Sequence, residues 1–218
     1  MTSTNLQPPR RALIVIDVQN EYVTGNLRIE YPDVQLSLAN IARAMDAAKA
    51  AGLPVVVVQH LYPEGAPVFA RGSEGADLHP LVASRQWDYL VEKSLASSFA
   101  GTGLGPWLRE HGIDTLSIVG YMTHNCDDAT ARQAMHEGRK VELLHDAAGS
   151  LPYANARGAA TAEEIHRVFT VVMHTAFAAV VSTEEWLAAV AAGEPLAGDN
   201  VYLSNQRALA ARAAEASA

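Results

Sequence analysis

The chemistry that the sequence suggests is centred on Cys126, the only cysteine among 218 residues. It follows an apolar run from Leu116 to Gly120 that predicts a buried strand, and it precedes residues 127–137, whose alanines and following Gly138 predict a helix. A thiol between a strand end and a helix start lies where open α/β sheets bind ligands and where a thiolate is favoured. Free cysteines are also often buried, so position alone fits a structural cysteine equally well.

Asp17 and Lys93 lie at the ends of two further predicted strands, 12–18 and 88–93. A carboxylate among the apolar residues of ALIVIDV is costly unless it is paired. Asp17 could instead cap the turn after its strand, and Lys93 could be a solvated charge. All strands of a parallel sheet end on one side of it, so we expect both residues and Cys126 to share one crevice.

Together these three side chains suit nucleophilic catalysis. Lys93 would hold Cys126 as a thiolate and pair with Asp17, and Asp17 would take the thiol proton and return it to a leaving group. Backbone N–H groups of the YMTHNC turn before the predicted helix would stabilise an oxyanion. No step of this chemistry needs a metal or another cofactor.

Strand and helix patterns alternate along the whole chain, which predicts an α/β protein: a single-domain, Rossmann-like parallel sheet of about six strands with helices on both faces. The predicted strands are 12–18, 54–59, 88–93, 116–120, 140–144 and 178–181, and the predicted helices are 34–51, 102–111, 127–137, 161–173, 182–192 and 206–216. Residues 1–11 are expected to form a flexible arm, 12–192 the domain, and 193–218 a tail with an Ala-rich helix. The long loop from His60 to Pro80 is expected to cover a site.

Composition narrows the class of protein. Hydrophobic residues make up 49% and charged residues 18% of the chain, as in soluble globular proteins. The net charge of −8 argues against a nucleic-acid or anionic-membrane surface. The sequence contains no apolar run that predicts a bilayer span, and its first residues, MTSTNLQPPRR, lack the apolar core of a signal peptide. We therefore expect a cytoplasmic protein, which with one cysteine has no intrachain disulfide.

Three stretches resemble the isochorismatase-like hydrolases, the cysteine hydrolase superfamily that includes nicotinamidases. They are ALIVIDVQNEY around Asp17, EKSLASSFAGTGL at Lys93 and GYMTHNCDDATARQAMHEG around Cys126, with LHP and LLHDA as lesser matches. The resemblance covers roughly residues 12–187 and implies that Asp17, Lys93 and Cys126 form a catalytic triad. It also implies a non-proline cis peptide between Tyr121 and Met122, with the N–H groups of Met122 and Cys126 as oxyanion donors.

The chain departs from the family pattern in two places. Nicotinamidases carry an Asp-x-His metal pair after the second strand, where this chain has His60 and Tyr62. No metal site is therefore expected. The family also usually has an apolar residue after the cysteine, whereas Asp127 and Asp128 follow it here. Two carboxylates suit a helix N-terminus, but they would raise the thiol pKa by like-charge repulsion.

The leading hypothesis is a metal-independent cysteine amidohydrolase that cleaves a small amide, carbamoyl or similar C–N bond through a thioester. One alternative is a vinyl-ether hydrolase of the isochorismatase type, and another is a catalytically silent ligand-binding protein on the same fold. The expected partners are a small-molecule substrate and copies of the chain in a homodimer or homotetramer. Candidate substrate contacts flank the triad: Gln19, Tyr22, His60, Tyr121 and His124.

Overall fold

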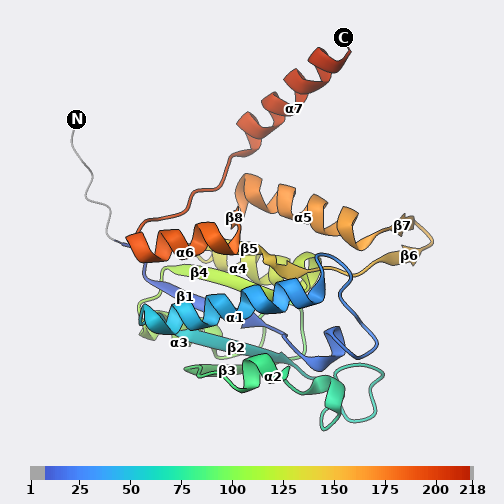
Figure 1. Ribbon diagram of the computed structural model, residues 1–218, viewed down its shortest axis with the longest axis vertical. Helices are drawn as coiled ribbons and strands as arrows, with labels where there is room; N and C mark the ends of the chain where they lie inside the picture. Colours follow the sequence, from blue (N-terminus) through green and yellow to red (C-terminus); the bar gives the residue numbers. More distant parts are fainter. Residues whose placement is uncertain (1–7, 217–218) are drawn as a thin grey trace.

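A six-stranded, wholly parallel sheet forms the centre of the computed structural model, which describes residues 8–216 (Figure 1). The strands follow the order β3-β2-β1-β4-β5-β8 across the sheet. They are β1 (Arg11–Ile16), β2 (Val55–His60), β3 (Tyr89–Lys93), β4 (Thr115–Tyr121), β5 (Lys140–Gly149) and β8 (Ala179–Val181). The predicted fold class is confirmed.

Helices cover both faces of the sheet (Figure 1). The helices α1 (Val34–Ala50), α2 (Pro80–Ala83) and α6 (Thr183–Ala192) pack on one face, and α3 (Leu104–Glu110), α4 (Asp128–His136) and α5 (Ala162–Ala176) pack on the other. Strand β1 shows why two cores form: Leu13 and Val15 belong to the first core, whereas Ile14 and Ile16 belong to the second. Alternate residues of a strand point to opposite faces, so a central strand must be apolar throughout.

The end of β5 and a short hairpin after it differ from the sequence prediction. Strand β5 does not end at Leu144 but continues to Gly149, so His145 and Asp146 lie within a strand and not in a loop. The pairing of β4 with β5 shifts register between Ile118–Leu143 and Gly120–Ala148, because β5 carries extra residues there, and the two strands pair again beyond the shift. The exposed hairpin of β6 (Tyr153–Asn155) and β7 (Gly158–Ala160) was not predicted, because its residues lack an alternating apolar pattern.

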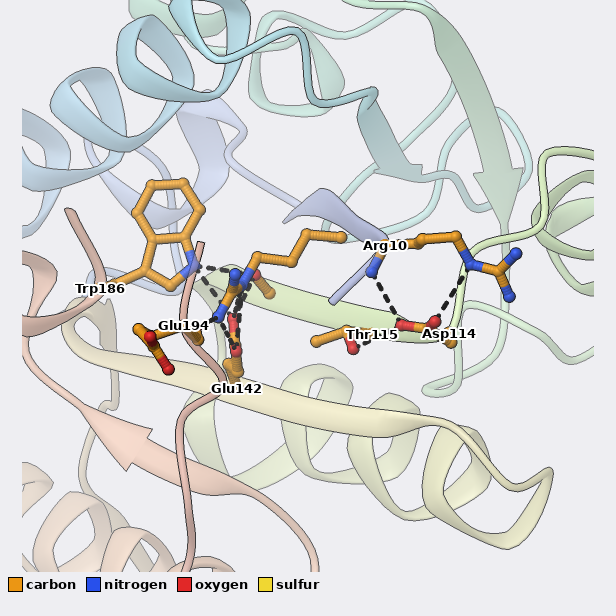
Figure 2. A network of polar contacts seen from close by, with 8 residues as sticks. Arg10, Asp114, Thr115, Glu142, Trp186 and Glu194 are labelled. Atoms are coloured by element: carbon orange, nitrogen blue, oxygen red, sulfur yellow. Dashed lines mark hydrogen bonds and ion pairs between the residues drawn. The ribbon is translucent and has the colours of Figure 1, made fainter. Parts of the chain in front are cut away.

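A buried ion pair joins β1 to β5 at the edge of the sheet where these strands begin (Figure 2). Arg11 donates two N–H groups to Glu142, with Nη2 2.8 Å from Oε1 and Nε 2.9 Å from Oε2. Glu142 Oε2 also accepts hydrogen bonds from Ser117 at 2.8 Å and from the Trp186 indole at 3.1 Å. This network ties α6 to three strands in the core.

Replacing Arg11 with methionine is expected to lower the free energy of unfolding by about 3–5 kcal/mol, because Glu142 would remain as an uncompensated buried charge. Arg10→Met is a matched control, since the pair of Arg10 with Asp114 is exposed and should contribute less than about 1 kcal/mol. Urea unfolding measures both variants. An equal loss of unfolding free energy in the two variants would show that the buried pair stabilises the fold no more than the exposed pair does.

The C-terminal helix α7 (Val201–Glu215) projects away from the sheet and its covering helices (Figure 1). None of its residues is buried, and Tyr202, Leu203 and Leu209 are exposed apolar side chains. The helix begins earlier than the predicted 206–216, because Asn200 caps it by accepting the N–H of Leu203. Residues 1–7 of the predicted arm and 217–218 of the predicted tail lie outside the described residues, so the domain boundaries stay predictions. No described helix is long and apolar enough to cross a membrane.

Candidate active site

Four neighbouring strands deliver polar side chains to one edge of the sheet. Asp17 directly follows β1, His60 ends β2, Lys93 ends β3, and Cys126 lies in the turn after β4. The chain proceeds outward from β1 to β2 and β3, and then returns to β4 on the other side of β1. The edge between β1 and β4 is therefore the switch point at which open α/β sheets bind ligands.

The approach of β4 to β1 beside Asp17 requires glycine at position 120. Gly120 has a φ of +118°, and a Cβ atom there would lie 2.0 Å from the carbonyl oxygen of Ile16. Asp17 itself has a φ of +51°, a left-handed conformation that is uncommon for a residue with a side chain. Strained backbone of this kind often accompanies a functional site.

The turn after β4 holds the cysteine. The peptide bond between Tyr121 and Met122 is cis, which is what the family resemblance implies. Residues Thr123–Asp127 form one π-helical turn, in which the carbonyl oxygen of Met122 accepts the N–H groups of Asn125 and Asp127. Cys126 therefore lies in the turn directly before α4, two residues ahead of its first residue, Asp128.

The three side chains predicted to act together are in contact. Lys93 Nζ lies 2.7 Å from Asp17 Oδ2 and 3.2 Å from Cys126 Sγ. The exposed fractions of the three residues are 0% for Asp17, 5% for Lys93 and 3% for Cys126. Charges held this close and away from water interact far more strongly than at the surface.

The electrostatics of this contact favour a protonated thiol at rest. Burial raises the pKa of Cys126, Asp17 raises it further, and Lys93 opposes both effects without overcoming them. Burial lowers the pKa of Lys93, but Asp17 and Cys126 outweigh it, so that the pKa is raised and the ammonium is retained. Burial and Asp17 therefore oppose the thiolate that Lys93 is expected to hold, because burying a charge is costly.

His60 is a fourth member of the cluster. Its Nδ1 lies 2.9 Å from Lys93 Nζ and 3.8 Å from Asp17 Oδ2. Ligand atoms of Asp17, His60 and Cys126 all lie within 4.8 Å of one another, which is close enough to hold a metal ion. Lys93 Nζ, however, contacts all three side chains and already occupies the position of a cation among them. The residues present therefore do not fit a metal centre.

The two carboxylates after the cysteine have different environments. Asp127 is fully buried, and neither of its oxygens has a hydrogen-bond partner among the described residues. Burial, and secondarily Asp17, raises the pKa of Asp127 well above its usual value, which disfavours the charged form of this carboxyl. Asp128 pairs with Arg132 at 2.7 Å. Both environments weaken the predicted like-charge repulsion of the thiolate, because the charged form of Asp127 is disfavoured and Asp128 is paired with Arg132.

Asp127→Asn is expected to gain about 1–3 kcal/mol of stability relative to the wild type as the pH rises from 4 to 7, because the amide keeps the size of the carboxyl but has no charged form to bury. A carboxyl whose folded pKa is raised destabilises the fold as the pH rises above the unfolded value of about 3.9. The gain should therefore shrink toward pH 4. Urea unfolding at several pH values checks this, with Asp128→Asn as control. A gain independent of pH would contradict it.

The other predicted substrate contacts are already engaged within the protein. The Gln19 side chain bonds the backbone N–H and carbonyl of His60, at 2.8 and 2.9 Å. Tyr22 packs against Tyr121 with ring centroids 5.5 Å apart, and both are buried in the core. Gln19, Tyr22 and Tyr121 therefore support neighbouring parts of the protein, and their contact with substrate stays a prediction.

His124 connects the cysteine turn to the β6–β7 hairpin. Its Nδ1 lies 3.0 Å from Ser150 Oγ, and its Nε2 lies 3.0 Å from the hydroxyl of Tyr153. Burial lowers the pKa of His124 to about 4, so the imidazole is neutral at pH 7. Sequence reasoning missed Tyr153, whose hydroxyl lies 3.9 Å from Met122 Sδ. The one feature of the sequence that could have indicated Tyr153 is that it stands next to the turn residues of a hairpin that was not predicted.

Comparison with known proteins agrees with this geometry. The protein-family model described as "Isochorismatase domain" matches residues 11–185. The uncharacterized isochorismatase family protein YddQ of Bacillus subtilis is 31% identical over 179 residues, which cover 81% of this chain and 98% of that protein. A crystal structure of a candidate isochorismatase from Burkholderia xenovorans superposes with a TM-score of 0.94 at 66% identity, covering 95% of this chain and 100% of that one.

Two further relatives carry names that state an activity. A streptothricin hydrolase of Streptomyces noursei is 36% identical over 139 residues, which cover 63% of this chain and 49% of that protein. A ureidoacrylate amidohydrolase of Agrobacterium fabrum is 28% identical over 175 residues, which cover 65% of this chain and 77% of that protein. With the domain match and the shared fold, these likenesses show that the chain belongs to the isochorismatase family and is a hydrolase.

Proposed function

We propose that this hydrolase is a cysteine amidohydrolase that cleaves the C–N bond of a small amide or carbamoyl compound through a thioester on Cys126. The observation that carries the proposal is the buried contact of one ammonium, Lys93 Nζ, with both Asp17 Oδ2 and Cys126 Sγ. A base, a cation and a nucleophile in contact away from water are the parts that acyl transfer requires.

In the proposed reaction Asp17 removes the thiol proton as Cys126 Sγ attacks the substrate carbonyl. The N–H groups of Met122 and Cys126 stabilise the tetrahedral oxyanion. Asp17 then gives its proton to the leaving nitrogen, and the C–N bond breaks to leave a thioester. Asp17 next activates a water molecule that releases the acid and restores the thiol. Lys93 stays charged throughout, which stabilises the anionic sulfur that forms only during reaction.

Two features support the choice of an amide bond. One relative is named an amidohydrolase, and the chain has the single cysteine that a thioester mechanism needs. A thiol that is protonated at rest also suits a mechanism in which proton removal and attack occur together, since Asp17 is in place to accept the proton.

The experiment that tests the proposal measures both the product, ammonia, and the covalent intermediate on Cys126. The protein is incubated with a panel of primary amides and carbamoyl compounds, and ammonia release is measured. Reactions are then quenched with acid and with hydroxylamine. We expect an acyl adduct on Cys126 by mass spectrometry and the matching hydroxamate after hydroxylamine. Turnover without an adduct or a hydroxamate would contradict a thioester.

The proposal extends to assembly and location: a small-molecule substrate, no cofactor, a cytoplasmic location and a homodimer or homotetramer. A helix with no buried residue gains little stability from packing, so α7 is expected to pack on a second copy through Leu203 and Leu209. Leu209→Glu should reduce the mass measured by light scattering. Leu36→Glu, an exposed change on α1, is the control. An unchanged mass in Leu209→Glu would exclude this use of α7.

A further inference from the structure

The His60 imidazole is held rigidly beside Lys93. His60 pairs with Lys93 in the register of β2 and β3, and Gln19 bonds both the N–H and the carbonyl of the His60 backbone. The ring lies edge-on to Tyr62, with centroids 4.6 Å apart, and tilted against Phe69 at 5.2 Å. Only 6% of the residue is exposed. Its orientation is therefore set by the fold and not by solvent.

The contacts of Lys93 determine which ring nitrogen of His60 carries hydrogen. An ammonium has three N–H donors and no acceptor. The partners of Lys93 Nζ are Asp17 Oδ2 at 2.7 Å, His60 Nδ1 at 2.9 Å and Cys126 Sγ at 3.2 Å. Because the ammonium can only donate, His60 Nδ1 must accept its N–H group. The hydrogen of the neutral ring consequently lies on Nε2.

The Nε2–H group is a buried donor without a partner. It has no hydrogen bond to any described residue and is shielded from solvent. A buried donor that makes no hydrogen bond is costly, and such groups in native proteins call for an explanation. Its place in the ring that contacts Lys93 and Asp17 puts it at the candidate reaction centre.

We propose that His60 has two roles, holding Lys93 through Nδ1 and donating Nε2–H to a substrate oxygen beside the scissile carbonyl. The inference rests on the proposed amidohydrolase function and narrows its substrates to acyl groups that carry a second oxygen acceptor. A site built to hydrogen-bond an oxygen rejects an analogue without it, because its own donor is then left unpaired.

Two variants separate the two roles. In His60→Asn the side-chain oxygen can replace Nδ1 as the acceptor for Lys93, but no donor remains at the position of Nε2. In His60→Gln the longer amide can place an N–H near the position of Nε2, but the Nδ1 acceptor is lost. The probes are two electrophiles, iodoacetamide, which carries a carbonyl oxygen beside the attacked carbon, and allyl bromide, which carries no acceptor. Alkylation of the single cysteine is followed by mass spectrometry.

We expect His60→Asn to slow alkylation by iodoacetamide about tenfold or more while changing the allyl bromide rate less than twofold. His60→Gln should slow both reagents, because Lys93 loses an acceptor. An unchanged ratio of the two rates in His60→Asn would overturn the proposal, and the allyl bromide rate shows whether the cysteine site is still formed. Alkylation does not require hydrolysis. If His60→Asn changes the ratio of the two alkylation rates but the wild type hydrolyses no amide, only the proposed amidohydrolase function is contradicted. If the wild type hydrolyses amides but His60→Asn leaves the ratio of the two alkylation rates unchanged, only the proposed role of His60 is contradicted.

Discussion

Cys126→Ala is expected to reduce kcat/KM for an amide substrate by about 10⁴-fold or more while the protein stays folded. A nucleophile and its base accelerate the reaction together, so removal of the nucleophile alone abolishes nearly all of the rate acceleration that the two provide. The fold should survive because the thiol contributes one small group to an apolar cluster, at a cost of about 1 kcal/mol. Ammonia release and a thermal melt measure the two effects.

Cys126→Ser sharpens the test. Serine keeps the size and the proton but is a far weaker nucleophile, so amide turnover should fall nearly as far as in Cys126→Ala. Full amide turnover in either variant would sink the thioester mechanism. Cleavage of a vinyl ether that survives in Cys126→Ser would instead favour the isochorismatase-type alternative. Tight binding of a small molecule without turnover in the wild type would favour a silent ligand-binding protein.

Lys93→Met is expected to lower kcat by roughly 10²–10³-fold, because an electrostatic partner that stabilises developing charge in a buried site is lost. Lys93 opposes the burial and the Asp17 charge that raise the pKa of Cys126, so its removal should raise that pKa further. At a given pH above neutrality less thiolate forms, and alkylation of Cys126 should slow. The pH midpoint of alkylation by iodoacetamide should lie above about 8.5 in the wild type and move higher in the variant.

Lys49→Met is a matched control for Lys93→Met, because Lys49 forms an exposed pair with Asp88. It should leave both kcat and the alkylation midpoint unchanged. Lys93→Met also leaves Asp17 without its ion pair, so a loss of about 3–5 kcal/mol in stability is expected. A wild-type midpoint well below 8.5 would contradict a resting protonated thiol. A midpoint indifferent to Lys93 would contradict the contact between the two side chains.

The sequence alone was enough to predict the architecture and the meeting of three distant residues. Near-continuous apolar runs that alternate with helical patterns leave few arrangements besides a parallel sheet between helices. In such a sheet every strand ends on the same side, which is why Asp17, Lys93 and Cys126 could be placed together without coordinates. The helix predicted over residues 34–51 matches α1, whose cap at Asp33 depends only on neighbours in the chain.

Only the tertiary structure decided the electrostatics of the site. The pKa of a group depends on burial and on charges that are distant in sequence, so the raised pKa of Cys126 and the raised pKa of Asp127 were not readable from residue types. The third contact of Lys93, with His60, arises from strand register, which spacing does not specify. The sequence therefore determined which residues meet, whereas packing determined which of them carry charge, because desolvation is a property of the assembled fold.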